Sequence, residues 1–404
     1  PAKLDYGTGY TLFDDQAPYG YVLDSTPVSF DVTEENSTQE GGITLIKVDK
    51  PNMAQKGTIS VEKTGEVFFG VNVSGEEDED VIYQPVYKVK GLAGAVYEIT
   101  ADEDVITPDG TLRYHKGDVV DTVTTDEDGT AKSKELYLGK YTVVETKAPT
   151  GMVINKEKHS VELTYAGQDV AVTETATSFV NERQKVKIFL EKILEQDETF
   201  GIGKNDEIKN ISFGLYAKED VVSSSGTVIP ADGLIEIITL DENGAATANT
   251  DLPFGSYYIK EIATDEHYIL SDTQYPFTFK YVGQDIETVE IKVNDGKSIE
   301  NKLIYGSVSG KKIDENGEAL GGALIGIFKA DETEFTKEHA IMTATSEKDG
   351  SFSFAKVPYG KWIVREIEAP EGFVLDDTSY EVNIGENEQV FEVESTDEYI
   401  HGNI

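Results

Sequence analysis

Apolar and polar residues alternate over short stretches along the whole chain. Examples are TISVE at 58–62, KYTVV at 140–144, SYYIK at 256–260 and KWIVR at 361–365. These stretches are rich in β-branched and aromatic residues, which is typical of half-buried β-strands. No stretch combines a sustained 3.6-residue apolar stripe with helix caps. The pattern predicts an all-β protein.

Turn sequences rich in Asp, Asn and Gly separate the predicted strands, for example DEDG at 126–129, DENG at 241–244 and KDG at 348–350. Around these turns a longer unit repeats. LGKYTVVETKAPTG at 138–151 and VPYGKWIVREIEAPEG at 357–372 align strand for strand, and the stretches 252–261 and 12–21 each keep one half of the unit. We therefore expect a tandem array of Ig-like β-sandwich modules.

Three polar positions recur in this repeat. A closing Asn precedes the next opening Lys by 11 residues in three places, from 52 to 63, from 181 to 192 and from 301 to 312. The recurring residues are the lysines Lys63, Lys192 and Lys312, the acids Asp14, Glu145, Glu261 and Glu366, and the closing residues Asn52, Asn181, Asn301 and Asn403. This spacing divides the chain into a partial module at 1–55 and complete modules at 56–183, 184–302 and 303–404.

A Lys, a Glu and an Asn at fixed places in a β-sandwich suggest one reaction. If the first strand of a module lies beside its last strand, the Lys amine and the Asn carboxamide can meet in the core beside the Glu. Burial disfavours both the ammonium and the carboxylate, so a neutral amine and a protonated acid become accessible. The amine can then attack the amide carbon while the acid shuttles protons, which releases ammonia and leaves a Lys–Asn isopeptide bond. We expect no cofactor for this reaction.

The opening xVxK strand, the ExxAPxG segment and the terminal Asn resemble collagen-adhesin B-type domains, also called CnaB, SpaA-like or prealbumin-like domains, of Gram-positive surface adhesins and pilins. The resemblance covers essentially the whole chain. It implies prealbumin-like sandwiches with intramolecular isopeptide bonds, attachment to the cell wall by sortase, and a role as a stalk. The triads that it implies are Lys63, Glu145 and Asn181, then Lys192, Glu261 and Asn301, and finally Lys312, Glu366 and Asn403.

Two copies depart from this pattern. The second has Ile262-Ala263-Thr264 where the others continue to Ala-Pro, which affects the expected loop after Glu261. The third has two adjacent lysines, Lys311 and Lys312, and the 11-residue spacing favours Lys312 as the nucleophile.

Charge and composition exclude several function classes. The chain has 35 Lys and Arg against 76 Asp and Glu, a formal net charge of −41, which excludes an electrostatic nucleic-acid binder. It has no Cys, and no apolar run approaches the length of a membrane span. The acidic turns leave calcium binding as an alternative, although the closing Glu of a calcium loop is missing. We find no signal peptide or sortase signal, so we expect any targeting elements outside this segment.

We predict a structural stalk segment on the extracellular, cell-wall-anchored surface of a Gram-positive bacterium, with the neighbouring modules of the same protein as its partners. The alternative is an adhesin region whose insertions at 64–91 and 101–124, rich in tyrosine, contact a host matrix protein or glycan. We do not expect a turnover enzyme, because no Ser/His/Asp order, phosphate loop or dinucleotide fingerprint appears. Each Glu would act once per molecule.

The first 55 residues keep an acid and a closing amide but lack the opening lysine. Lys3 is too close to Asp14 to serve, so we expect the chain to begin inside a module. A strand from an upstream chain, or contacts in a crystal or filament, would then cover the open sheet edge. We expect Asn52 to remain an intact carboxamide.

Overall fold

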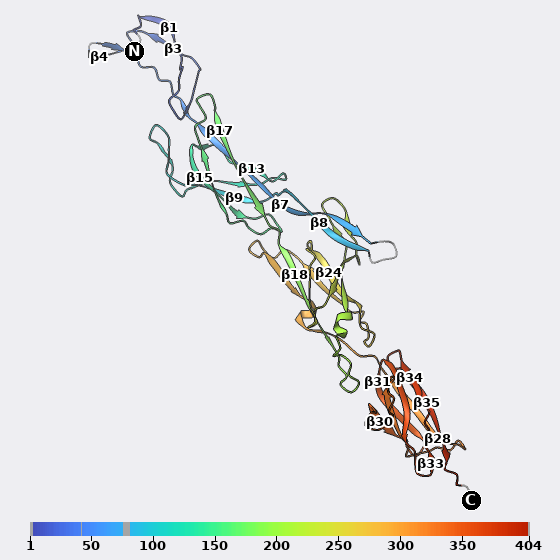
Figure 1. Cartoon of the computed structure of the whole chain (residues 1–404). Helices are drawn as coiled ribbons and strands as arrows, with labels where there is room; N and C mark the ends of the chain where they lie inside the picture. The colour runs from blue at the N-terminus through green and yellow to red at the C-terminus, as the bar shows by residue number, and fades with distance from the viewer. Residues whose placement is uncertain (1–2, 42, 76–80, 403–404) are drawn as a thin grey trace.

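The computed structural model describes residues 3–41, 43–75 and 81–402. Among the described residues, β-strands are the main regular structure, and the helical elements are two short 3-10 helices, η1 (Glu207–Asn210) and η2 (Val293–Gly296). Figure 1 shows the modules following one another along an elongated rod, with the two termini at opposite ends. The predicted all-β tandem array is confirmed. Within the described ranges, no helix has the length and apolar content needed to cross a membrane.

The N-terminal segment forms three small two-stranded sheets, β1-β3, β2-β6 and β4-β5. Its strands are β1 (Gly7–Leu12), β2 (Tyr21–Val22), β3 (Val28–Val32), β4 (Thr38–Glu40), β5 (Ile43–Leu45) and β6 (Met53–Ala54). Among the described residues it contributes only Ala17 and Val32 to the buried apolar set, while Phe13 and Tyr19 are 63% and 76% exposed. This segment therefore has no core of its own comparable to those of the modules that follow.

The first module packs two sheets face to face. One has the order β13-β7-β17, with β14 also paired to β7, and the other is β12-β9-β15-β16. The strands are β7 (Lys56–Ser74), β8 (Ile82–Gly91), β9 (Val96–Ala101), β10 (Val105–Ile106), β11 (Leu112–Tyr114), β12 (Val119–Thr124), β13 (Thr130–Lys132), β14 (Leu136–Tyr137), β15 (Gly139–Lys147), β16 (Lys158–Leu163) and β17 (Val172–Asn181). Ile59, Tyr97, Tyr141 and Phe179 meet in the core between the sheets.

The second module repeats this arrangement. β18 pairs with β23, β26 and β27, and the opposing sheet contains β22-β19-β24-β25. The strands are β18 (Lys185–Leu194), β19 (Ser212–Ala217), β20 (Val221–Val222), β21 (Val228–Ile229), β22 (Leu234–Thr239), β23 (Ala245–Ala248), β24 (Gly255–Ala263), β25 (Gln274–Phe279), β26 (Thr288–Lys292) and β27 (Ile299–Asn301). Its core includes Ile188, Phe213, Tyr257 and Ile299.

The third module has the sheets β31-β28-β35-β33 and β30-β29-β32-β34. Its strands are β28 (Tyr305–Asp314), β29 (Leu324–Lys329), β30 (Met342–Thr345), β31 (Ser351–Pro358), β32 (Gly360–Glu368), β33 (Phe373–Val374), β34 (Tyr380–Ile384) and β35 (Val390–Tyr399). Gly310 lies in the middle of β28 because the Phe352 ring occupies the place of a side chain, and a Cβ atom there would come within 1.9 Å of the ring. The module boundaries themselves stay a prediction.

A hairpin of the first module reaches onto the second. β7 continues past the sandwich and returns as β8, whose residue Ile82 pairs with Leu234 of β22. Phe68 and Tyr83 pack against the core of the second module. The Tyr87 hydroxyl donates to the Asp251 carbonyl oxygen at 2.9 Å. The hairpin therefore braces the two modules against each other (Figure 1).

A buried glutamine orders the loop of the second module that contacts the first module. Gln184 donates from Nε2 to the carbonyl oxygens of Gly283 and Ile286 at 3.0 and 2.7 Å, and its Oε1 accepts from Val282 N at 3.0 Å. Gln284 of the same loop reaches back and accepts from Ala148 N at 2.9 Å.

The preceding joint has the same construction. Gln55 donates to the carbonyl oxygens of Gly167 and Val170 at 2.9 and 2.5 Å, and Gln168 accepts from Ala17 N at 2.9 Å. Side-chain to backbone contacts thus fix the first module on both of its neighbours.

Candidate functional site

The strand order brings the predicted lysines beside the closing residues. β7 runs parallel to β17, β18 to β27, and β28 to β35, so each module's first and last long strands are neighbours. Lys63 is in register with Phe179, two residues before Asn181, and Lys192 with Ile299, two residues before Asn301. Side chains two apart on a strand share a face. The amine and the amide therefore point into the same part of the core.

The first site is fully enclosed. The Lys63 amine donates a short hydrogen bond to Oδ1 of Asn181 and lies 3.3 Å from Oε1 of Glu145. The Asn181 amide nitrogen donates to both Glu145 carboxylate oxygens at 3.0 Å. All three residues are at most 2% exposed. Glu145 comes from β15 in the opposing sheet, so the site joins both sheets of the sandwich.

The second site repeats this geometry. Lys192 Nζ lies 2.5 Å from Oδ1 of Asn301 and 3.0 Å from Oε1 of Glu261. The Asn301 amide nitrogen donates to both Glu261 oxygens at 2.9 Å and also to Thr264 Oγ1 at 2.9 Å. Thr264 stands where the other copies continue to Ala-Pro, and it adds a contact to the amide without displacing Glu261.

A turn glycine holds each lysine backbone in place. Gly129, Gly244 and Gly350 have φ of 81°, 80° and 79°, and their carbonyl oxygens each accept from the backbone N–H of the site lysine at 2.7 Å. A Cβ atom on any of them would lie 2.2–2.3 Å from the lysine carbonyl oxygen. Only glycine fits both the conformation and the space. The turns recognised in the sequence thus have a direct role in the sites.

The third site brings Lys312 together with a carboxylate instead of an amide. Lys312 Nζ lies 2.5 Å from Oδ1 of Asp397 and 3.3 Å from Oε2 of Glu366, and all three residues are at most 3% exposed. Lys312 is in register with Ser395, so Asp397 holds the place that Asn181 and Asn301 hold in the other modules. Lys311 is exposed on the opposite face of β28.

The structure does not test the expectation for Asn403. Asn403 itself lies outside the described residues, and β35 ends at Tyr399. The prediction relied on the distance from Glu366 to a closing Asn, which depends on loop lengths. The inward alternation of Val393, Ser395 and Asp397 along β35, at 5%, 3% and 1% exposure, is the signal that identifies Asp397. We therefore replace Asn403 by Asp397 as the candidate partner of Lys312.

In the N-terminal segment, the predicted acid and amide also meet. Asn52 donates from Nδ2 to Oδ2 of Asp14 at 2.6 Å. Lys50 is the lysine nearest to Asn52 in sequence, and its amine instead contacts Asp24 Oδ2 and the Thr26 carbonyl oxygen, both at 2.6 Å. The hydrogen bond from Lys50 lowers the pKa of Asp24 to about 2. Asp14 and Asn52 thus correspond to the acid and the amide of a complete site.

Burial governs the electrostatics of the three sites. Removal from water lowers the pKa of both Lys63 and Lys192, although the adjacent glutamates oppose this effect. Burial raises the pKa of Glu366 to about 7, and the neighbouring Asp397 adds to the rise. Glu366 Oε1 and Asp397 Oδ2 are buried without a hydrogen-bond partner, and Asp397 Oδ1 has the ion pair with Lys312.

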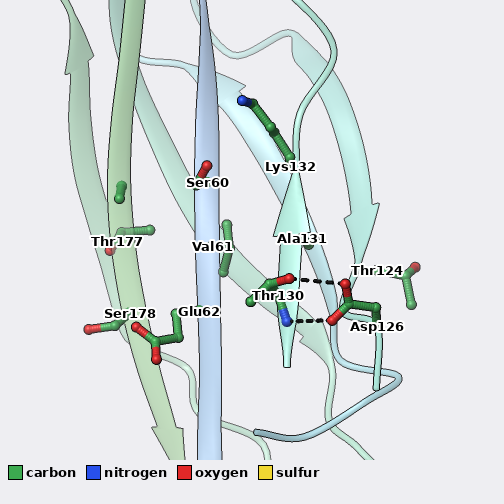
Figure 2. A pocket seen from close by; sticks show the side chains of 11 residues that line it. Ser60, Val61, Glu62, Thr124, Asp126, Thr130, Ala131, Lys132, Thr177 and Ser178 are labelled. Atoms are coloured by element: carbon green, nitrogen blue, oxygen red, sulfur yellow. Dashed lines mark hydrogen bonds between the residues drawn. The ribbon is translucent and has the colours of Figure 1, made fainter. Parts of the chain in front are cut away.

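A groove on the first module contains none of these triads. It measures about 720 Å³ and lies over β13, β7 and β17 in the first module. Figure 2 shows that Ser60, Glu62, Lys132 and Ser178 line it and that Asp126 accepts two hydrogen bonds from Thr130.

The acidic turns use their carboxylates internally. Asp241 Oδ1 accepts from the backbone nitrogens of Asn243 and Ala245, at 2.9 and 2.8 Å. In the part of the chain that the structure describes, no three His, Cys, Asp or Glu side chains are grouped so that they could hold a metal ion.

The tyrosines of the two insertions are largely engaged within the chain. Tyr83 packs on the second module, and the Arg183 guanidinium lies 3.6 Å from the ring centroid of Tyr87. Tyr114 packs against Tyr137 with ring centroids 6.0 Å apart, and Tyr97, which lies between the two insertions, is fully buried in the first core.

The sequence matches the SpaA family, described as a prealbumin-like fold domain, over residues 86–177, 199–297 and 306–399. Among solved structures, the TIE protein of Bacillus anthracis is 20% identical with a TM-score of 0.57, and the match covers 86% of this chain and 52% of that one. The chain thus spans about half the length of that structure. No protein with a curated description is similar in sequence.

Two pilin structures are also similar. The major pilin subunit BcpA of Bacillus cereus is 16% identical with a TM-score of 0.35, covering 86% of this chain and 100% of that one. The major pilin SpaD of Corynebacterium diphtheriae is 16% identical with a TM-score of 0.24, covering 86% and 98%. At such identities the structural likeness concerns the fold alone.

Proposed function

Because the chain belongs to the SpaA family of prealbumin-like fold domains, we propose that it is a stalk segment of a cell-surface adhesin or pilin of a Gram-positive bacterium, anchored to the cell wall. In this proposal each complete module forms one intramolecular isopeptide bond without a cofactor. The bonds join Lys63 to Asn181, Lys192 to Asn301 and Lys312 to Asp397. Glu145, Glu261 and Glu366 move the protons.

The observation that carries this proposal is the position of the leaving group. In the first and second sites the amide oxygen faces the lysine amine, and the amide nitrogen faces the glutamate at 2.9–3.0 Å. Attack of Nζ on the amide carbon breaks the C–N bond. Glutamate takes a proton from Nζ and delivers it to the departing nitrogen, so ammonia leaves and an amide bond remains.

Folding supplies most of the rate in this scheme. Aminolysis of an amide between separate molecules is very slow, but a lysine and an amide held in contact react as one molecule with high effective molarity. The neutral amine is the reactive form, and burial that lowers the pKa of Lys63 and Lys192 makes it more accessible. The bond forms once and is not reversed, so the module is not a turnover enzyme.

The architecture supports a load-bearing role. The crosslinks join the first strand of a module to its last, and the glutamine joints and the β7–β8 hairpin leave little freedom between the first two modules. Tension applied along the rod then passes through the covalent bond and bypasses the rest of the sandwich. Ligand binding through the insertions at 64–91 and 101–124 is less favoured, because their tyrosines are already packed within the chain.

Peptide mapping of the purified chain tests this proposal. Digestion and tandem mass spectrometry should recover three branched peptides, containing Lys63 with Asn181, Lys192 with Asn301, and Lys312 with Asp397. The Glu145→Gln variant should lose only the first of them. Recovery of the linear peptides alone from the wild-type chain would overturn the proposal.

A further inference from the structure

Beside Lys312, Glu366 and Asp397, the third site contains a serine, Ser395, and a further acid, Asp376. Ser395 is the residue in register with Lys312, and its Oγ lies 2.7 Å from Lys312 Nζ. Ser395 Oγ donates in turn to Oδ2 of Asp376 at 2.7 Å. The corresponding residues in the other modules are Phe179 and Ile299, which offer the lysine no hydrogen-bonding side chain. The third module therefore has a hydrogen-bonded path from the lysine amine through Ser395 to the Asp376 carboxylate, and Phe179 and Ile299 provide no such path in the other two.

The acids around Lys312 have different tasks. Glu366 from β32 and Asp397 from β35 face the amine directly, and Asp376 lies beyond Ser395 and also accepts from the Tyr380 hydroxyl at 3.1 Å. Glu366 is largely protonated below its raised pKa of about 7, and in that form it cannot take a proton from the lysine. A carboxylic acid partner such as Asp397 also reacts only when protonated. A second base is therefore required.

Asp376 is suited to that task. Burial alone would raise its pKa, but hydrogen bonds from Thr378, Ser395 and Tyr380 outweigh this and hold the pKa below its usual value. It is therefore still ionised just below pH 7, where Glu366 is already largely protonated. It is only half-buried, so it can exchange its proton with water.

We propose that Ser395 and Asp376 form a proton relay that deprotonates Lys312 and so allows it to react with Asp397. The inference rests on the proposed isopeptide bond. Ser395 contacts the reacting nitrogen and is a catalytic residue in this scheme. Asp376 acts through Ser395 and is a positioning and proton-accepting residue.

The step balances without any added reagent. The Lys312 ammonium passes one proton to Ser395 Oγ, which passes its own proton to Asp376. The neutral amine attacks Cγ of Asp397, whose carboxyl group carries one proton in this scheme. A second Nζ proton then moves through Glu366 to the departing oxygen, which leaves as water, and the Nζ–Cγ amide bond retains the last proton. One of the four initial protons remains on Asp376 or Glu366, and the net charge does not change.

Refolding kinetics test the relay. Chain recovered from inclusion bodies in guanidinium has not folded, so all three sites start unreacted on dilution into buffer. Samples quenched in acid are digested, and the three branched peptides are quantified over time. We expect Ser395→Ala and Asp376→Asn to slow the Lys312–Asp397 bond at least tenfold. The bonds of the first two modules, in the same molecules, should form at unchanged rates.

The pH profile separates a relay from a merely structural hydrogen bond. In the wild type, the rate of the third bond should fall as pH rises through about 7, because Glu366 loses its proton. In Ser395→Ala and Asp376→Asn, Glu366 is the only base left, so the rate should instead rise over the same range. Ser395→Thr, which keeps the hydroxyl, should restore the wild-type profile. Ser309→Ala, at an exposed position of β28, the strand that carries Lys312, should not change it.

Folding is monitored independently through Trp362, the only tryptophan of the chain, which lies in the core of the third module. Rates within twofold of wild type in both variants, with unchanged pH profiles, would overturn the relay. So would slow bond formation that Trp362 fluorescence traces to slow folding in both variants. Absence of the third branched peptide from the wild type, with the first two present, would instead overturn the Lys312–Asp397 bond itself.

Discussion

Replacing Lys63 by Met removes the proposed bond of the first module with little other change. Lys63 is fully buried beside Phe179, so a methionine of similar length fits the site. Asn181 and Glu145 keep their mutual hydrogen bonds. Positions 63 and 181 are 118 residues apart in sequence. Without the covalent link between them, a pulling force acts on the whole stretch of chain in between.

The expected mechanical effect is large. A chain of 118 residues extends to about 400 Å at roughly 3.4 Å per residue. Pulling the full chain from tags at its two ends should show no such step from the first module in the wild type. The Lys63→Met variant should gain one step of about 400 Å, less the few tens of ångströms that the folded module spans. By the chain-entropy model, the lost loop closure also lowers the free energy of unfolding by about 5 kcal/mol.

The control is Lys132→Met, which removes an exposed lysine from the same sheet and its surface ion pair with Glu174. A surface pair of this kind contributes at most about 1 kcal/mol, so the force trace should match the wild type. A wild-type trace that already contains a step of this length from the first module, or a Lys63→Met trace without one, would refute the reasoning.

Four further predictions follow from the site and the joints. Gly244→Ala places a Cβ atom 2.2 Å from the Lys192 carbonyl oxygen, so the yield of the branched Lys192–Asn301 peptide should fall severalfold. The control Gly226→Ala has a similar φ of 85° but open space around it, and it should leave this yield unchanged. Gln184→Ala leaves two carbonyl oxygens and a backbone N–H of the loop 282–286 without their partner, at a cost of about 1–3 kcal/mol. Because Gln284 of this loop contacts Ala148 of the first module, small-angle scattering should then show a shorter, more bent rod, and an unchanged maximum dimension would argue against this role of the loop. Tyr87→Ala should raise hydrogen exchange in β8 and β22, and equal protection in both proteins would contradict the bracing role of the hairpin. Burial lowers the lysine pKa in the first two sites, and the neutral fraction of an amine grows with pH. The Lys63–Asn181 and Lys192–Asn301 bonds should therefore form faster as pH rises from 5 to 8, in contrast to the Lys312–Asp397 bond. A flat pH profile would count against attack by the neutral amine.

The local repeats were sufficient to predict the β-sandwich array and the residues of the first two triads. An inward-facing lysine, a strand glutamate and a closing asparagine recur at spacings that loop differences barely disturb. The spacing of 11 residues from Asn301 also selects Lys312 over Lys311, and the structure places Lys312 in the core.

What the sequence did not reveal depends on register and on contacts between modules. Asp397 was missed because a search for Asn ignored the inward alternation of β35, and Ser395 and Asp376 become neighbours of Lys312 only through strand pairing. The extension of β7 onto the second module could not be foreseen either. Its residues 66–74 read as an ordinary insertion, and only the packing of Phe68 and Tyr83 against the neighbouring core shows their role.

The intact mass of the denatured, purified chain tests the central claim most directly. Two Lys–Asn bonds release two molecules of ammonia, and one Lys–Asp bond releases one molecule of water. The account predicts that the chain is lighter than its sequence mass by the sum of these three losses. A chain with the unmodified sequence mass would contradict it.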